Sequence, residues 1–336
     1  MPDEQSTVGP HHMQRGSDET MAEKGSPARS IPSLMSALRL HDPVGVAGLV
    51  LEQLETPRPG PGEALVRVHA AAITRHELDW PVDRLPATPS YEFAGVVASV
   101  GPGVEEVTIG EPVYALGDFT HDGAAADYAV VPADLLAPKP RTLGFVESAA
   151  VPLAALTAWQ ALFDHGNLRE GERVLIHGAA GGVGGFAVQL AHGRGAYVIG
   201  TASGGNVATA RSLGADQVID HTTTRFEDVV EEVDLVFDTV GGDRLERSPA
   251  VVRRGGRLVS VATDPPQERA AARGIAALYF IVEPSREQLV ELARLVDDGD
   301  LRVTIDEVFA LADARAAFER SLGEHGGGKI VLRVAE

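Results

Sequence analysis

Residues 174–190 constrain the fold of this chain more than any other segment, because a short apolar run leads through a glycine-rich turn into a helical pattern. The segment reads VLIHGAAGGVGGFAVQL, and Gly178, Gly181 and Gly184 recur at every third position. Residues 174–177 predict a buried strand, and the following apolar residues have helical spacing. Glycines let a backbone approach an anion, and the free N–H groups of a first helical turn point toward it. The segment therefore predicts a binding site for the phosphates of a nucleotide.

Strand and helix patterns alternate after this turn. Short runs rich in Val, Ile and Leu predict strands at residues 196–202, 217–220, 234–239, 257–262 and 277–282. Helical patterns lie between them, at about residues 206–213, 226–230 and 244–253. Strands that are apolar on both faces are typical of a parallel sheet covered by helices on both sides. Right-handed crossovers then predict a doubly wound nucleotide-binding sheet. An unrelated α/β domain with an incidental glycine loop is the competing interpretation.

The segments on either side have a different character. Between residues 36 and 140, strand-like runs are broken repeatedly by Gly and Pro, which predicts a mainly antiparallel β barrel. Residues 147–163 read as helices that bridge two domains. Residues 283–301 contain an amphipathic helix, with Leu289, Leu292, Ala293 and Val296 on one face. The C-terminal strand, helix and strand are expected to rejoin the barrel.

Composition limits the classes of function. A chain of 336 residues predicts two domains, and a formal charge of −19 argues against nucleic acid or an acidic membrane surface as the main partner. No apolar run approaches the roughly 20 residues that span a bilayer. The polar start of the chain predicts a disordered arm without an evident targeting peptide, so the cytoplasm is the expected location. The absence of cysteine excludes disulfides and thiol catalysis, and it removes the soft ligands of zinc sites.

Six motifs occur in a characteristic order: AALTAWQAL, HGAAGGVG, RSLGADQVID, VFDTVGG, GGRLVSVA and GGGKIVLRV. In this order they resemble the medium-chain dehydrogenase/reductase superfamily, and within it the zinc-independent, NADPH-dependent quinone oxidoreductase and enoyl reductase group. The resemblance implies an α/β protein with a GroES-like β-barrel catalytic domain and a Rossmann domain. The expected bounds are an arm at 1–35, a barrel domain at 36–155 completed by 301–336, and a nucleotide-binding domain at 156–300.

The resemblance also bears on metal binding. Zinc-dependent relatives carry C-x-x-D and G-H-E-x-x-G motifs, whereas this chain has TRHE at residues 74–77 and SYEFAG at residues 90–95. Tyr91 therefore replaces the ligand histidine, and no cysteine is present. His76 and Glu77 alone do not make a site. We expect no metal and no zinc mechanism.

The predicted cofactor is NADPH, with NADH also accepted. Residues 200–206, at the end of the second strand, contain no carboxylate that would repel a 2′-phosphate. Ser203 and His221 are candidates for contact with that phosphate, and Arg211 could supply a charge. The full set of predicted cofactor-binding residues is Thr157, Gly178, Ala180, Gly181, Gly182, Val183, Thr201, Ser203, Arg211, His221, Val240, Phe280 and Val282.

The roles at the nicotinamide end are implied by the resemblance. It places Thr157 against the ring, with Val240 and the main chain of 280–282 flanking the same site. Ordinary core packing is the alternative for Phe280 and Val240.

Without a metal, hydride transfer needs hydrogen-bond donors that stabilise the developing enolate or quinol oxygen. Thr74, Tyr91 and water are the candidate donors, and Trp80 could form a flat wall for a conjugated substrate. A buried hydroxyl bonded to backbone is the alternative role for Tyr91. These residues favour reduction of a quinone or an activated alkene. A protein that binds NADPH as a sensor or as a structural group remains the alternative from another class.

Assembly is a further expectation from the resemblance. Residues 277–284 form an apolar segment at the predicted end of the nucleotide-binding sheet, and exposed sheet edges favour pairing. In relatives, two such strands join the sheets of a dimer. A homodimer through the strand that contains Phe280 is therefore expected.

Overall fold

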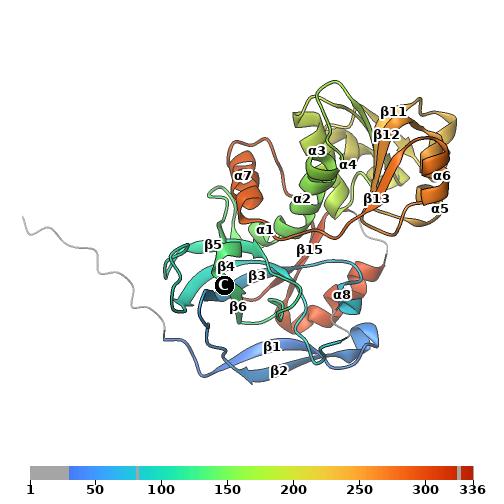
Figure 1. Ribbon diagram of the computed structural model, residues 1–336. Coiled ribbons are helices and arrows are strands. Elements are labelled where there is room, and N and C mark those ends of the chain that lie inside the picture. Colours follow the sequence, from blue (N-terminus) through green and yellow to red (C-terminus); the bar gives the residue numbers. More distant parts are fainter. Residues whose placement is uncertain (1–29, 81–82, 324–326, 336) are drawn as a thin grey trace, which may run out of the picture. The chain divides into compact units, whose positions relative to one another are not determined.

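A parallel sheet of six strands forms one half of the computed structural model, which describes residues 30–80, 83–323 and 327–335 (Figure 1). Its strand order is β10-β9-β8-β11-β12-β13. The bounds are β8 (Arg173–His177), β9 (Tyr197–Ala202), β10 (Gln217–Asp220), β11 (Val233–Asp238), β12 (Val252–Ser260) and β13 (Ala276–Tyr279). The order reverses between β8 and β11, and ligands of doubly wound sheets bind beyond the carboxyl ends of the strands at such a point. The predicted doubly wound sheet is confirmed.

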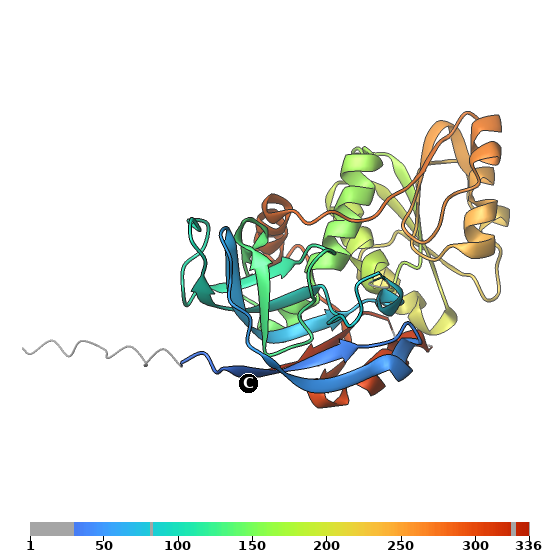
Figure 2. The same cartoon turned by 60° about the horizontal axis from the view of Figure 1, so that its bottom comes forward.

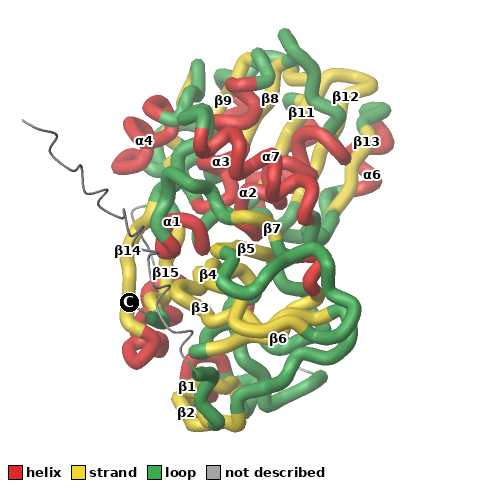
Figure 3. The backbone as a smooth tube through the Cα atoms, turned by 90° about the vertical axis from the view of Figure 1, so that its left-hand side faces the viewer, coloured by secondary structure: helices red, strands yellow, loops and turns green. Residues whose placement is uncertain are grey.

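Helices cover both faces of this sheet. Strand β8 shows why, because Val174 and Ile176 point into one apolar core and Leu175 points into another. The helices on the first face, drawn in front of the sheet in Figure 3, are α2 (Pro152–Trp159), α3 (Gly182–Gly193), α4 (Val207–Ser212) and α7 (Arg286–Asp297). The helices on the second face are α5 (Gly242–Arg247) and α6 (Gln267–Ala272). In α7 the predicted apolar face is buried.

A mainly antiparallel sheet forms the other half. It has seven strands in the order β14-β15-β3-β4-β5-β7, with β6 paired to β3. The bounds are β3 (Glu63–Ile73), β4 (Glu92–Val100), β5 (Pro112–Leu116), β6 (Tyr128–Pro132), β7 (Ala137–Pro138), β14 (Ile305–Ala310) and β15 (Lys329–Arg333). Strand β15 pairs with β3, so the C-terminal segment rejoins this half as predicted. The connecting helices are α1 (Phe145–Ala149) and α8 (Ala314–Leu322).

The start of the described chain differs from the prediction. Strand β1 (Leu34–Leu40) pairs with β2 (Leu49–Glu55) in a ribbon that is drawn in blue in Figure 2. Leu34 and Met35, which the sequence analysis assigned to the arm, thus belong to a strand. Most of the predicted arm, residues 1–29, lies outside the described residues.

Three other elements are shorter than predicted. Helix α5 ends at Arg247, because Pro249 has no N–H to continue the helix, and a short 3₁₀ turn follows at Ser248–Ala250. The last strand ends at Tyr279, because its partner β12 ends opposite it at Ser260. Val282 therefore lies beyond the sheet. Residues 226–230, predicted as helical, form only a 3₁₀ turn at Phe226–Asp228.

Residues 32–336 form one compact unit that contains both sheets. The hydroxyl of Tyr114 in β5 donates to the carbonyl of Leu289 in α7 at 2.5 Å, which ties the two halves together. Among the helices of the described residues, none combines the length and apolar character that a membrane span requires.

Candidate functional site

The glycine turn after β8 has the geometry of a phosphate-binding site. Gly178 adopts φ +75°, which side chains disfavour, and Gly181 precedes the first turn of α3. The N–H groups of Val183 and Gly184, in the first turn of α3, have no acceptor among the described residues. A Cβ atom at Gly184 would lie 2.1 Å from the carbonyl oxygen of Gly178. The turn therefore requires glycine at 184 and presents free donors at a helix N-terminus, which fits a pyrophosphate.

A buried chain of hydrogen bonds supports the turn from below. The N–H of Gly178 donates to Thr201 Oγ1 at 3.4 Å, and that hydroxyl lies 3.1 Å from His177 Nδ1. His177 Nε2 lies 3.0 Å from Ser248 Oγ, which donates to the carbonyl of Arg244. Burial, together with the charge of Arg244, lowers the pKa of His177 to about 3, so the ring is neutral. Thr201 is fully buried and anchors the turn to α5 through this chain.

The C-terminal segment lies against the same turn, which the sequence analysis did not predict. Gly181 forms a bridge with Gly328, and a Cβ at Gly327 would lie 2.5 Å from the carbonyl oxygen of Ala180. A Cβ at Gly182 would lie 2.9 Å from Lys329 Cδ. A side chain at 182 would therefore displace Lys329, which lies directly against this part of the turn.

Polar groups gather where β9 and β10 end, around the predicted 2′-phosphate contacts. Ser203 Oγ accepts from Asn206 Nδ2 at 3.1 Å. The N–H of His221 donates to the carbonyl of Ala202, and its Nδ1 accepts from Arg244 at 3.1 Å. Burial, then the charge of Arg244, lowers the pKa of His221. Its ring is therefore held neutral, with Nε2–H free to donate.

Arg244 is a functional candidate that the sequence analysis missed. Within the described ranges it forms no ion pair with a carboxylate, although the chain is strongly acidic. Nothing in the DTVGGDRLER segment signals its position, since it reaches His221 only through the fold. The predicted Arg211 lies on the exposed side of α4. One carboxylate faces this region, because Asp220 Oδ2 would lie 3.0 Å from a Cβ at Gly204.

The residues predicted for the nicotinamide end are largely internal. Thr157 is 4% exposed, and its hydroxyl donates to the carbonyl of Leu153 at 2.6 Å. The ring of Phe280 packs on His165 at 4.4 Å, and Val282 is buried. The side chains of Phe280 and Val282 therefore pack in the core, so any cofactor contact would come from their main chain. Val240 is 42% exposed and lies beside Gly178.

Thr74 belongs to a buried ionic cluster that the sequence analysis also missed. Lys329 Nζ lies 2.5 Å from Glu92 Oε1, 3.0 Å from the carbonyl oxygen of Ile73 and 3.2 Å from Thr74 Oγ1. Glu92 Oε2 accepts from the N–H of Leu153 at 2.9 Å. The signal available in the sequence was a charged residue at the first position of each of two apolar strands, β4 and β15.

Glu77 is the third ionisable residue of this region. It is 1% exposed, and burial raises its pKa to about 8, although the charge of Lys329 opposes this rise. At neutral pH, Glu77 is therefore protonated. The pair Lys329–Glu92 and a neutral Glu77 together carry no net charge.

A pH-dependent stability follows from the buried Glu77. Because its folded-state pKa lies above the ordinary value of 4.5, its contribution is present below that value and is lost as the pH rises through about 8. Between pH 4.5 and about 8, the free energy of unfolding of the parent protein should fall because of Glu77, by at most about 1.4 kcal/mol per pH unit. Glu77→Gln should lack this part of the fall. Urea unfolding of both proteins at pH 5 and pH 8 measures the difference. Parallel pH dependences would contradict the assignment.

Aromatic side chains form a wall next to Tyr91. Trp80 is 39% exposed and packs on Tyr91 and Phe119, with ring centroids 5.9 and 5.5 Å away. Tyr91 is 2% exposed, and burial raises its pKa to about 12. Its hydroxyl accepts from Arg84 at 2.8 Å. The hydroxyl of Tyr91 is thus buried, as the alternative interpretation expected, but its hydrogen-bond partner is a side chain and not the backbone.

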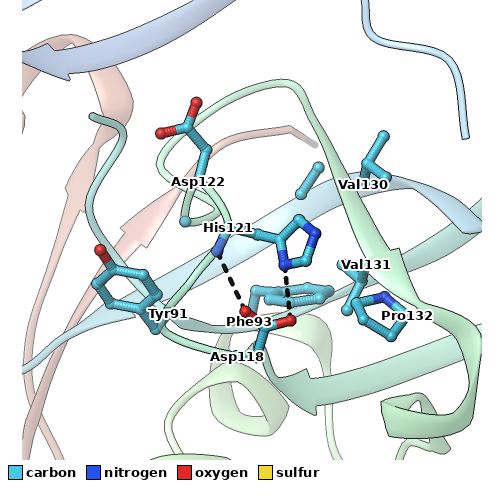
Figure 4. A pocket seen from close by; sticks show the side chains of 11 residues that line it. Tyr91, Phe93, Asp118, His121, Asp122, Val130, Val131 and Pro132 are labelled. Carbon is cyan, nitrogen blue, oxygen red and sulfur yellow. Dashed lines mark hydrogen bonds and ion pairs between the residues drawn. The ribbon is translucent and has the colours of Figure 1, made fainter. Parts of the chain in front are cut away.

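Tyr91 also lines the small cavity shown in Figure 4. The cavity has a volume of about 10 Å³, room for about one water molecule. His121 and Asp118, joined at 2.7 Å between Nδ1 and Oδ2, form part of its lining. A groove of about 490 Å³ lies at the C-terminal ends of α3 and α7, and no predicted site residue lines it. Neither hollow is the predicted substrate site.

Metal ligands do not gather in the part of the chain that the structure describes. No three His, Cys, Asp or Glu side chains there lie close enough to share an ion. The positions that the resemblance equates with zinc ligands hold Thr74 and Tyr91.

Comparison with known proteins defines the class. Residues 60–141 match the alcohol dehydrogenase GroES-like domain, and residues 213–332 match the family described as zinc-binding dehydrogenase. A probable zinc-binding oxidoreductase, mitochondrial, of Arthroderma benhamiae is 33% identical over 88% of this chain and 96% of its own length. An NADPH-dependent alkenal/one oxidoreductase, chloroplastic, of Arabidopsis thaliana is 32% identical over 90% of this chain and 80% of its own.

A solved structure agrees with these relatives. The quinone oxidoreductase from Coxiella burnetii superposes with a TM-score of 0.84, at 32% identity, over 90% of this chain and 99% of its own. The chain therefore has the α/β fold of these oxidoreductases, with a GroES-like domain and a Rossmann domain. It belongs to the medium-chain dehydrogenase/reductase superfamily, as the sequence motifs predicted.

Proposed function

We propose that this protein reduces a quinone or the C=C bond of an α,β-unsaturated carbonyl with hydride from NADPH. The observation that carries the proposal is the cluster at Thr74, where a hydroxyl held by Lys329 and Glu92 occupies a position that is a metal ligand in zinc-dependent relatives. The names of the alkenal/one and quinone oxidoreductase relatives support the same substrate classes.

NADPH supplies a hydride at C4 of its nicotinamide ring when bound. The free N–H groups of the α3 turn would hold its pyrophosphate. The β-carbon of an enone accepts the hydride, its π electrons move to the carbonyl oxygen, and a solvent proton reaches the α-carbon. The Thr74 hydroxyl would stabilise the oxygen that becomes negative. The wall formed by Trp80 and Phe119 offers a flat apolar surface for a conjugated substrate.

Oxidation of NADPH in the presence of a panel of quinones and enones tests the proposal. We expect steady loss of the near-ultraviolet absorbance of NADPH with at least one acceptor of either class. Tight NADPH binding without turnover on any acceptor would favour the sensor function.

We infer that the protein prefers NADPH to NADH through Arg244 and His221. A hydrogen bond to a charged group contributes about 1.5–3 kcal/mol, so Arg244→Met should raise the Kd of NADPH about 10–100-fold. NADH, which lacks the 2′-phosphate, should bind unchanged. Arg211→Met is the comparison, because Arg211 is exposed and a small effect is expected. Equal losses for NADPH and NADH in Arg244→Met would contradict this role.

We also infer that activity does not need zinc. A chain without cysteine lacks the thiolate ligands of the zinc-dependent relatives. Metal content and activity should be measured before and after exhaustive treatment with a strong chelator. Stoichiometric zinc whose removal abolishes activity, and whose return restores it, would contradict the inference.

Finally, we propose a homodimer through the edge of the parallel sheet. Strand β13 is the last strand of that sheet, and Tyr279 at its end and Ile281 just beyond it are 40% and 63% exposed. Light scattering at micromolar concentration should report twice the mass of one chain, and a monomer would count against the proposal.

A further inference from the structure

The hydroxyl of Thr74 has only one direction left for its hydrogen. Lys329 Nζ lies 3.2 Å from Thr74 Oγ1, and an ammonium group can only donate. Thr74 must therefore accept this bond and direct its own hydrogen elsewhere. Among the described residues, the acceptor of this hydrogen is Glu92 Oε1, at a long 3.4 Å. That distance leaves the hydrogen of Thr74 weakly held and available to a ligand.

All three hydrogens of the Lys329 ammonium group are already engaged in hydrogen bonds. Its three hydrogens are directed at Glu92, the carbonyl of Ile73 and Thr74. It is also buried, with 7% of its side chain exposed. Lys329 therefore has no hydrogen left for a substrate, and it can influence a bound substrate only through Thr74.

Both sides of the predicted cofactor site connect to this cluster. The stem of Lys329 passes the first turn of α3, since its Cδ would lie 2.9 Å from a Cβ at Gly182. Glu92 accepts from the N–H of Leu153, whose carbonyl accepts from Thr157. Thr74 is thus linked through Lys329 to the phosphate turn, and through Glu92 to the helix that carries Thr157.

We propose that Lys329, fixed by Glu92, is a positioning residue that occupies the acceptor side of the Thr74 hydroxyl and turns its hydrogen toward the substrate oxygen. This inference rests on the proposed function. The positive charge of Lys329 polarises the hydroxyl, and the cluster with neutral Glu77 carries no net charge to repel a developing enolate. Thr74 donates a hydrogen bond to that oxygen, and the protons that complete the reaction come from solvent.

A comparison of enones with quinones as substrates distinguishes a positioning role of Lys329 from a purely structural role. An enone develops a full enolate charge on one oxygen, whereas a quinone spreads its charge and needs less help from a donor. Thr74→Val, which keeps the shape and removes the hydroxyl, should lower the ratio of enone to quinone kcat by about 10–100-fold. Thr74→Ser, which keeps the hydroxyl, should restore the ratio to within about threefold of the parent. The KM for NADPH should change little in either variant.

Lys329→Met tests whether the lysine acts through Thr74. Alone it should lower the same ratio, and in the Thr74→Val background it should lower the ratio no further. An unchanged ratio in Thr74→Val, whether both kcat values stay the same or fall equally, would overturn the inference while leaving the proposed function in place. Additive effects of the two changes would overturn the role of Lys329. If Lys329→Met does not fold, Lys329→Met combined with Glu92→Gln, which leaves no unpaired charge, takes its place, and a parent-like ratio in that protein would overturn the role of Lys329. Failure of the parent protein on every enone and quinone would overturn the proposed function instead.

Discussion

Replacing Lys329 by methionine is expected to lower the free energy of unfolding by about 3–5 kcal/mol, because it leaves Glu92 as an uncompensated charge in the interior. Both side chains are buried, at 7% and 1% exposure, and Lys329 bridges β15 to the end of β3. Urea-induced unfolding followed by circular dichroism measures the change. Arg333→Met is the matched control, because Arg333 lies on the same strand and is exposed. Equal midpoints for the two variants would contradict the assignment of a buried pair.

A double variant separates loss of the pair from loss of the lysine stem. Lys329→Met combined with Glu92→Gln removes both charges and keeps an acceptor for the N–H of Leu153. Because the penalty arises from the unpaired charge, this combination should recover most of the stability lost in Lys329→Met. A double variant no more stable than Lys329→Met would show that packing of the stem, and not charge, carries the effect.

Gly184→Ala is expected to reduce NADPH affinity by at least about 100-fold, because the free N–H donors at the start of α3 would lose their common direction. The added Cβ would lie 2.1 Å from the carbonyl oxygen of Gly178, so the turn must move. Fluorescence titration with NADPH measures the affinity, and circular dichroism monitors the fold.

Gly193→Ala is the control for this change. Gly193 ends the same helix, and a Cβ there would meet nothing within 4 Å. Its NADPH affinity should equal that of the parent. Parent-like affinity in Gly184→Ala would show that the phosphates do not bind at this turn.

Local sequence patterns were sufficient to predict those parts of the fold that depend only on short segments. The glycine turn, the two-faced apolar strands and the amphipathic face of α7 were predictable, because strand and helix periodicity report burial directly. Strand β1 was missed, because its segment directly follows a polar stretch and pairs with its neighbour only across a turn. The strand at 277–282 was predicted too long, because its end depends on where the neighbouring strand ends.

The site was predictable only where backbone geometry defines it. The position of the glycine turn could be predicted from glycine spacing, but Arg244 and Lys329 reach their partners through tertiary structure. Lys329 and Thr74 are 255 residues apart in sequence. Thr201, predicted as a cofactor-binding residue, lies near the end of β9, and its hydroxyl supports the turn from inside through His177. No local pattern distinguishes a hydroxyl that faces a ligand from one that faces a buried histidine.

The proposed function requires direct hydride transfer from the nicotinamide to a carbon atom of a conjugated acceptor. The most direct measurement is the position of deuterium in the product after reduction of an enone with NADPH labelled at C4, using each of the two C4 epimers. We predict one deuterium at the β-carbon of a saturated ketone, delivered from a single epimer. Deuterium on the carbinol carbon of an unsaturated alcohol would show carbonyl reduction and contradict the account.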